Sequence, residues 1–399
     1  MHCIWHSGIN SYHAFSADGA NWTAIDTPMF STALNISAAA PAPSPGTAAA
    51  AAAAPCASAA DCSLLGSCSA GVCQCSPGYT GPTCGQLALR PAASLAAATL
   101  WPQPGVGNSS AWGFTVAFDP TDRLYHAVAD VSCGCDKTSP VRECTEFTGV
   151  LASGGYASSL VHLTSSRPDG GFKFVSVLAP ATSFNPHLVR SPAGVFALYF
   201  RVNAVDPLPL CSGDPAGPTS SEGSLIKVCV GSNRENCIHA GGAESGTNMY
   251  VATARSMRGP WRVRPVTVAG EGALHVSNPS VAFIRPGTPA ASLGKVAISF
   301  RYNSPHGENN GIGFADDPAG PFRAVANLSF APDTPAAMGS AAWGEGVFEL
   351  KRRERPELHD HDSSDGHNAV LYNGASAMVN GVYRAFSLVQ AVGASGNEP

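Results

Sequence analysis

The chain has 399 residues and a net charge of −5, and only 13% of its residues are charged, whereas 42 are glycine and 32 are proline. This length leaves room for two or three domains, and the composition is typical of a turn-rich β protein. The chain contains no basic run, so neither nucleic acid nor an anionic membrane surface is expected as a partner. No apolar run has the length and character of a membrane-spanning helix, so no membrane insertion is expected.

A linker follows the first segment of the chain. Residues 38–55 are almost entirely Ala, Pro, Ser and Gly, with very little that could be buried. Such a composition predicts a disordered, partly extended tether. Residues 1–37 are therefore expected to form a segment detached from the rest.

Six cysteines come next, at Cys56, Cys62, Cys68, Cys73, Cys75 and Cys84. A segment below roughly 40 residues cannot bury a stabilising apolar core, so disulfides must replace it, which indicates an oxidising compartment. Spacing alone does not choose among the possible pairings. The ending Cys-x-Cys-x-x-Gly-Tyr-Thr-Gly-x-x-Cys resembles an epidermal-growth-factor-like (EGF-like) module over residues 56–84. This resemblance implies the pairs Cys56–Cys68, Cys62–Cys73 and Cys75–Cys84, and no calcium, because Ala54-Pro55 stands where calcium-binding members carry acidic residues.

Four triplets for N-linked glycosylation agree with secretion, at Asn21, Asn35, Asn108 and Asn327. The start of the chain, however, lacks the basic residues and the apolar core of a secretory signal. We therefore expect that the true N-terminus is missing from this sequence and that the protein is extracellular or in the secretory pathway.

From Trp101 onwards, short apolar runs alternate with Gly, Pro, Asn and Asp clusters, which predicts an all-β region. Residues 184–200 and 277–301 share one form, in which a strand that opens near Asn-Pro is followed by a Gly-containing turn and a second strand. After each comes another apolar run closed by a Gly-Pro-aromatic element, at residues 259–261 and 320–322, and residues 160–172 are a weaker third copy. Repeated four-stranded units of this kind predict the blades of a β-propeller.

These Asn-Pro openings and Gly-Pro-aromatic ends resemble the five-bladed propellers related to arabinanases, β-xylosidases and invertases. A less characterised branch of that superfamily is similar at Trp112-Gly113, at Cys133-Gly134-Cys135, at residues 352–358 and at residues 371–374. The resemblance covers about residues 101–390 and implies an all-β, five-bladed propeller, possibly an incomplete one, beside the small disulfide-rich module.

The chain departs from these relatives at one blade. Relatives carry a blade of the form His-x-x-x-His followed by His-Ala-Phe-Ser-x-Asp-Gly-x-x-Trp before the arginine-rich strand, whereas here that pattern lies at residues 2–22. Residues 1–37 are then either the remnant of an upstream propeller or the blade that closes the downstream one from across the linker. We expect a remnant, because closure through the EGF-like module would need a permuted chain.

Glycoside hydrolysis needs two carboxylates across the scissile bond, and active relatives carry aspartates where this chain has Asn185 and Asn278. An amide can hydrogen-bond a sugar hydroxyl but cannot act as an acid or a base. The remaining candidates lie near the arginine-rich strand, where Glu354 and Glu357 could be catalytic and Glu345 is a third carboxylate. A structural ion-pair network there is the favoured interpretation. The predicted ligand-binding residues are Asn185, Asn278, Arg353, Arg355 and Trp112.

No metal or cofactor is expected. The group His359-Asp360-His361-Asp362 with His367 could bind a divalent ion, but a solvated loop is the favoured interpretation. Asp119 is expected in a hairpin turn, and His162 and His275 as β-sheet histidines with satisfied hydrogen bonds. Of the seven further cysteines, Cys3 is expected to be unpaired. The other six flank two polar insertions and are expected to pin loops at the propeller rim: Cys133, Cys135, Cys144, Cys211, Cys229 and Cys237.

Two functions are open. The favoured one is a secreted EGF-like-domain protein whose glycosidase-like propeller binds a glycan or an extracellular protein partner, because the aspartates expected of an enzyme are absent. The alternative is an active glycoside hydrolase that uses the carboxylates near the arginine-rich strand.

Overall fold

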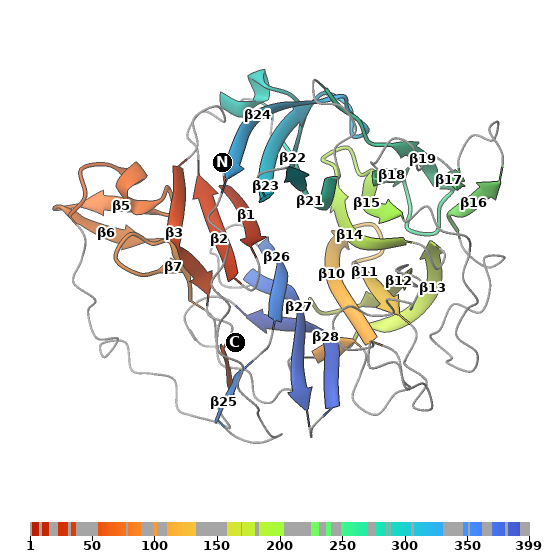
Figure 1. Cartoon of the computed structure of the whole chain (residues 1–399), viewed down its shortest axis with the longest axis horizontal. Coiled ribbons are helices and arrows are strands. Elements are labelled where there is room, and N and C mark those ends of the chain that lie inside the picture. Colours follow the sequence, from red (N-terminus) through yellow and green to blue (C-terminus); the bar gives the residue numbers. More distant parts are fainter. Residues whose placement is uncertain are drawn as a thin grey trace. The chain divides into compact units, whose positions relative to one another are not determined.

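The structure is a computed structural model of the whole chain, shown in Figure 1. The residues that it describes are 2–7, 10–15, 23–30, 33–36, 55–76, 79–88, 99–101, 110–132, 158–168, 170–179, 183–202, 225–230, 237–240, 249–269, 276–284, 286, 289–304, 307–329, 346–349, 352–360, 369–379 and 382–391. Among these residues there is no α-helix, and short 3-10 turns occur at Ala59–Cys62 and Pro289–Ser292. The prediction of an all-β chain is confirmed. No helix among them has the length and apolarity of a membrane span.

Contacts divide the chain into two units. The first unit is Met1–Thr99 with Asp333–Val382 and Leu388–Pro399, and the second is Leu100–Pro332 with Tyr383–Ser387.

The second unit contains three four-stranded antiparallel meanders, which run in Figure 1 from orange to yellow-green, from yellow-green to green, and from teal to blue. The first sheet is β10 (Ser110–Asp119), β11 (Leu124–Ser132), β12 (Ser158–Ser165) and β13 (Lys173–Ala179). The second sheet is β14 (Ser183–Arg190), β15 (Phe196–Val202), β18 (Met249–Ala254) and β19 (Arg262–Pro265). The third sheet is β21 (Val276–Phe283), β22 (Val296–Ser304), β23 (Gly307–Ala315) and β24 (Phe322–Ser329), and β20 (Val268–Ala269) pairs with β24. These meanders agree with the predicted four-stranded units, whereas the number of blades stays a prediction.

The middle sheet is buried on both faces, as its second strand shows. Successive side chains of a strand point to opposite faces. Phe196, Leu198 and Phe200 of β15 accordingly pack into a core with β11, β12 and β13 of the first sheet. Ala197 and Tyr199 pack into a second core with β21, β22 and β24 of the third sheet. A strand buried on both faces reads as a continuous apolar run, which is the sequence of β15.

The Gly-aromatic elements close the predicted repeats as hairpins. Each joins the third strand of a sheet to the fourth, and the aromatic residues Phe172, Trp261 and Phe322 are buried. Gly259 and Gly320 have φ of +80° and +89°, a region that glycine adopts without strain. The sequence repeats therefore mark equivalent corners of successive sheets.

Between β15 and β18, the described residues of the long insertion form the parallel pair β16 (Lys227–Val230) and β17 (Cys237–Ala240). Cys229 and Cys237 lie in these strands, and Cys3 lies in β1. Cys133, Cys135, Cys144 and Cys211 lie outside the described residues, so the predicted rim disulfides stay a prediction.

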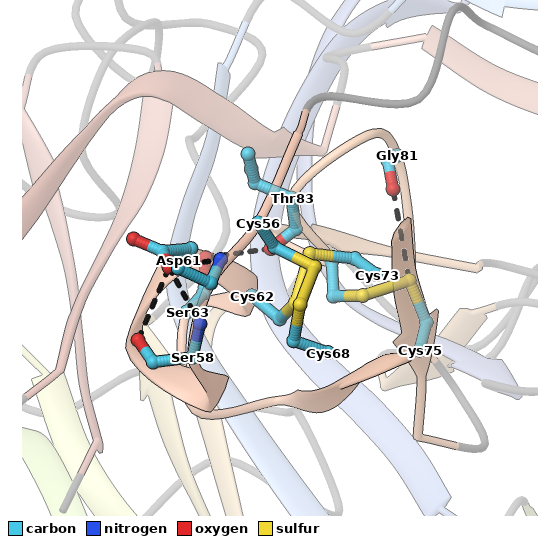
Figure 2. Close-up of a disulfide and its surroundings, with 12 residues drawn as sticks. Cys56, Ser58, Asp61, Cys62, Ser63, Cys68, Cys73, Cys75, Gly81 and Thr83 are labelled. Atoms are coloured by element: carbon cyan, nitrogen blue, oxygen red, sulfur yellow. Dashed lines mark hydrogen bonds between the residues drawn. A yellow bond between two sulfur atoms is a disulfide. The ribbon is translucent and has the colours of Figure 1, made fainter. Parts of the chain in front are cut away.

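In the first unit, three disulfides hold the cysteine-rich segment. Cys56–Cys68 and Cys62–Cys73 are labelled in Figure 2, and the third pair is Cys75–Cys84. These are the pairs that the EGF-like resemblance implies. Two small hairpins carry them, β5 (Gly66–Ser69) with β6 (Val72–Cys75) and β7 (Tyr79–Thr80) with β8 (Gln86–Leu87). The apolar cluster contains little besides the half-cystines, Leu65 and Tyr79. The disulfides therefore do the work of a core here.

The N-terminal segment also forms strands of the first unit. β1 (His2–Ser7), β2 (Asn10–Phe15) and β3 (Thr23–Phe30) make one sheet, of which β1 and β2 contact β26 (Arg352–Asp360). β4 (Ala33–Ile36) pairs with β25 (Gly346–Glu349). Paired strands satisfy each other's backbone groups. Whether residues 1–37 are a detached remnant or belong with the downstream strands stays a prediction.

A further sheet has the order β26, β27 (Ala369–Val379), β28 (Val382–Ala391) and β9 (Thr99–Trp101). It contains the arginine-rich strand, which is β26 itself. Asn35 and Asn327 lie in β4 and β24, whereas Asn21 and Asn108 lie outside the described residues. Glycosylation at these four sites stays a prediction.

Candidate functional site

The first strand of each four-stranded sheet carries the same irregularity. In β10, β14, β21 and β26 the register shifts so that two residues oppose one residue of the second strand. Such a β-bulge bends the strand and redirects side chains, and bulges are over-represented beside active sites. The four bulge dipeptides are Trp112-Gly113, Asn185-Pro186, Asn278-Pro279 and Arg355-Pro356.

The second residue of each bulge dipeptide is of a type that favours a bulge. Three of them end in proline, which has no N–H to donate to a neighbouring strand and is tolerated within sheets at bulges. The fourth ends in Gly113, whose φ of +79° favours glycine. The sequence repeat and the bulge are therefore the same feature.

In the second unit, three of these bulges occur in neighbouring strands. β10 contacts β14, and β14 contacts β21. The hydroxyl of Thr115 accepts a hydrogen bond from the Leu188 N–H at 2.8 Å, and His187 Nε2 donates to the Val281 carbonyl at 2.9 Å. Thr115, Leu188 and Val281 each follow the bulge of their own strand by the same number of residues. The three bulges therefore lie at about the same height along the neighbouring strands.

A buried carboxylate faces the first bulge. Asp130 of β11 is the residue that opposes Trp112-Gly113, since its neighbours pair with Ala111 and Phe114. Only 2% of Asp130 is exposed, and its Oδ2 accepts a hydrogen bond from the backbone N–H of Asn185 at 3.2 Å. Asp130 therefore joins the bulge of the first sheet to that of the second.

Asn185 has an unusual backbone conformation. Its φ is +58°, in the left-handed region that asparagine enters more readily than most residues. Residues held in sparsely populated backbone regions cluster at functional sites, and Asn185 is also buried and bonded to a carboxylate of the neighbouring sheet.

The predicted ligand-binding residues fall mostly on the bulges. Trp112, Asn185 and Asn278 lie at the three bulges of the second unit, and Arg355 lies at the equivalent position of β26. We call Trp112, Asp130, Asn185 and Asn278 the bulge site. The roles assigned to these residues stay predictions.

Glu354 and Glu357 flank the bulge of β26, and Arg353 precedes them in the same strand. The side chains of these three residues lie outside the described part of the structure, and so does Glu345. Of the predicted loop histidines, His359 ends up in β26, while His361 and His367 lie outside the described residues. Catalysis by Glu354 or Glu357 therefore stays a prediction.

Two groups were not anticipated as sites from the sequence. Asp130 lies in an apolar run, Ala127–Val131, and only the register of β11 brings it opposite a bulge. The second group is Asp119, Asp122 and His126, with His162 behind it.

This second group lies on the β10–β11 hairpin. Asp119 is the last residue of β10, and its Oδ1 accepts from the Thr121 N–H at 3.0 Å, as the expected turn residue would. His126 Nε2 lies 3.1 Å from Asp122 Oδ2, and His126 Nδ1 lies 2.9 Å from His162 Nε2. The carboxylate accepts the proton on His126 Nε2, so a neutral His126 accepts at Nδ1 from His162.

His162 differs from the satisfied β-sheet histidine expected from the sequence. Only 2% of the residue is exposed, and its Nδ1 has no hydrogen-bond partner among the described residues. Burial, together with the smaller effects of the charges of His126 and Arg258, lowers the pKa of His162 to about 3. His162 is therefore a neutral imidazole near physiological pH.

No protein-family model matches the chain, and no match was found among curated proteins. Among solved structures, it is similar to a family 117 glycoside hydrolase of the marine bacterium Zobellia galactanivorans, with 13% identity over 76% of this chain and 91% of that chain and a TM-score of 0.41. It is also similar to the GH43_1 enzyme from Xanthomonas citri, with 12% identity over 70% of this chain and 69% of that one and a TM-score of 0.31. For an α-L-arabinofuranosidase from Podospora anserina, the identity is 12% over 76% of this chain and 95% of that one, with a TM-score of 0.29. Because these identities and TM-scores are low, the similarities assign neither a reaction nor a substrate to this chain.

Proposed function

We propose that this chain is an extracellular carbohydrate-binding protein and that the bulge site contacts the glycan. The observation that carries the proposal is the repeated bulge, which puts Trp112, Asn185 and Asn278 at one level of three neighbouring strands. The three disulfides support an oxidising, extracellular location.

The residue types at the bulges suit a sugar. Side-chain amides both donate to and accept from hydroxyl groups, and an aromatic ring offers an apolar face for the C–H groups of a pyranose. Trp112, Asn185 and Asn278 carry no charge and Asp130 is an acid, so a neutral glycan fits the bulge site better than a polyanion. Asp130 acts as a positioning residue, because its carboxylate fixes the Asn185 backbone through the 3.2 Å hydrogen bond.

A glycan-array screen of the full chain tests this proposal, followed by titration of the best glycan against variants. Asn185→Gly removes the amide but keeps a residue that tolerates a φ of +58°. Asn278→Ala removes the second amide. Gln74→Ala is the matched control, because Gln74 is an exposed amide in the disulfide-linked module.

Loss of one or two hydrogen bonds should weaken glycan binding about tenfold in Asn185→Gly and in Asn278→Ala. Gln74→Ala should bind like the parent protein. Absence of binding across the array, or equal affinity in all variants, would overturn the proposal.

A second candidate is glycoside hydrolysis, which the buried carboxylate of Asp130 favours. Hydrolysis needs a pair of carboxylates, about 5 to 5.5 Å apart for retention or 6.5 to 9.5 Å for inversion. Glu354 and Glu357 are the candidates from the sequence for a partner. Release of reducing sugar by the parent protein, abolished in Asp130→Asn and in Glu354→Gln or Glu357→Gln, would select the enzyme over the binding protein.

A further inference from the structure

The Asp119, Asp122 and His126 group lies apart from the bulge site. β10 runs from its bulge near Trp112 to its end at Asp119, so the two groups occupy opposite ends of one strand. The ligand atoms of these three side chains all lie within 4.8 Å of one another. Nothing in the proposed glycan-binding function uses them.

The hairpin fixes both carboxylates before any ligand arrives. Asp119 Oδ1 accepts from the Thr121 N–H and Asp122 Oδ1 from the Leu124 N–H, each at 3.0 Å. The Asp119 carbonyl also accepts from the Arg123 N–H at 2.8 Å. Each aspartate thus has one oxygen held by the turn, while Asp122 Oδ2 points toward His126 Nε2.

His162 is an independent observation that indicates a ligand at His126. A histidine that binds a metal through one ring nitrogen usually donates its other N–H to a second group, which fixes the ring. His126 Nδ1 lies 2.9 Å from His162 Nε2, and both rings are buried and nearly parallel. With a metal on Nε2, the His126 proton would move to Nδ1 and be donated to His162 Nε2, which reverses the direction that this bond has without metal. The other ring nitrogen of His162, Nδ1, has no partner among the described residues, so burying this ring costs stability. The contact of Nε2 with His126 is what the buried ring supplies in return.

We propose that Asp119, Asp122 and His126 bind a divalent transition-metal ion, with Zn²⁺ as the best fit, and that His162 is the positioning residue behind His126. Imidazole together with carboxylates suits zinc, whereas calcium and magnesium prefer oxygen ligands alone. Three protein ligands leave a fourth position for water.

The geometry needs a small adjustment. Zinc bonds of about 2.0 to 2.2 Å put tetrahedral ligand atoms roughly 3.4 Å apart, so a group spread over 4.8 Å must contract. The Asp122 side chain is 46% exposed and can move. Asp119 Oδ1 already accepts from the Thr121 N–H and lies 3.5 Å from Arg190 Nη2, so Asp119 would have to bind the ion through Oδ2.

Isothermal titration of the full, disulfide-intact chain with Zn²⁺ tests the proposal. Asp122→Asn keeps the Oδ1 acceptor for Leu124 and removes only the negative charge and ligand oxygen. Asp316→Asn is the matched control, because Asp316 is an exposed aspartate in another turn. His162→Gln tests the positioning role.

We expect one zinc ion per chain to bind at Asp119, Asp122 and His126. Its affinity should be at least about tenfold weaker in Asp122→Asn and in His162→Gln. The affinity should be unchanged in Asp316→Asn. Thermal unfolding without metal shows whether each variant is folded. Co²⁺ should give the absorption of a tetrahedral site in the parent protein and lose it in Asp122→Asn. No zinc binding, or zinc binding that Asp122→Asn leaves unchanged, would overturn the proposal. Binding unchanged in His162→Gln alone would overturn only the role of His162.

Discussion

At the scale of single residues, a glycine corner shows how tightly the sheets meet. Gly320 has a φ of +89°, and a Cβ there would collide with the Thr267 carbonyl and lie 2.7 Å from the Phe322 nitrogen. Gly320→Ala should therefore cost about 1 to 3 kcal/mol in unfolding free energy. Gly170→Ala is the control, because a Cβ at Gly170 has open space, and we expect a change within about 0.5 kcal/mol. Urea denaturation of both variants measures the difference, and equal stability would contradict this account.

A surface ion pair gives a pH-dependent prediction at the same scale. Burial raises the pKa of Asp317, but hydrogen bonds from Arg264 and the Ala319 N–H and the charges of Arg264 and Arg262 outweigh it, so the pKa lies below 3.8. When a carboxyl has a lower pKa in the folded protein than in the unfolded chain, its charge stabilises the fold fully above the pKa of the unfolded chain. This stabilisation is lost as the pH falls through the pKa of the folded protein.

Asp317→Asn should therefore destabilise the protein at neutral pH, and the difference from the parent should shrink as the pH falls below 3.8. Because the Asp317 side chain is 49% exposed, we expect less than about 1 kcal/mol. Denaturant unfolding across this pH range measures it, with Asp316→Asn as control. A constant difference at every pH would show that the lost charge is not the cause.

At the scale of elements, the disulfide-linked module has almost no core apart from its cystines. The Cys75–Cys84 bridge joins residues separated by 9 positions, and loss of such a loop constraint costs about 3 kcal/mol. In the double variant Cys75→Ser, Cys84→Ser, hydrogen exchange should accelerate in residues 79–88. Peptides from β14 and β15 are the internal control and should keep their protection. Unchanged exchange in the module would mean that the other two bridges suffice.

The elements also show where prediction from the sequence stops. The Asn-Pro and Gly-Pro-aromatic repeats lie at equivalent places in successive sheets because proline and glycine act locally, so the sequence reports them. Asp130 and His162 reach their neighbours only because of the register in which the strands of the first sheet pair. Val128 pairs with His162, which brings His162 beside His126 from 36 residues away. No local pattern contains that pairing.

At the scale of the whole molecule, the N-terminal strands lead to a prediction about a chain that lacks residues 1–37. β1 and β2 contact β26, and β4 pairs with β25, all within the first unit. A strand that loses such neighbours exposes its backbone groups and its apolar face to water. These contacts favour the alternative in which residues 1–37 belong with the downstream strands, and the choice between it and a detached remnant stays a prediction.

Deletion of residues 1–37 should deprotect β26 in hydrogen exchange and lower the solubility of the protein, because β26 and β25 lose the strands that cover them. Peptides from β14 and β15 in the second unit serve as the internal control and should exchange at the same rate in both proteins. Adding residues 1–37 as a separate peptide should restore protection of β26 in part, since only the covalent tether is lost. If β26 exchanges equally with and without residues 1–37, the segment is an independent remnant, and the downstream strands form their sheet without it.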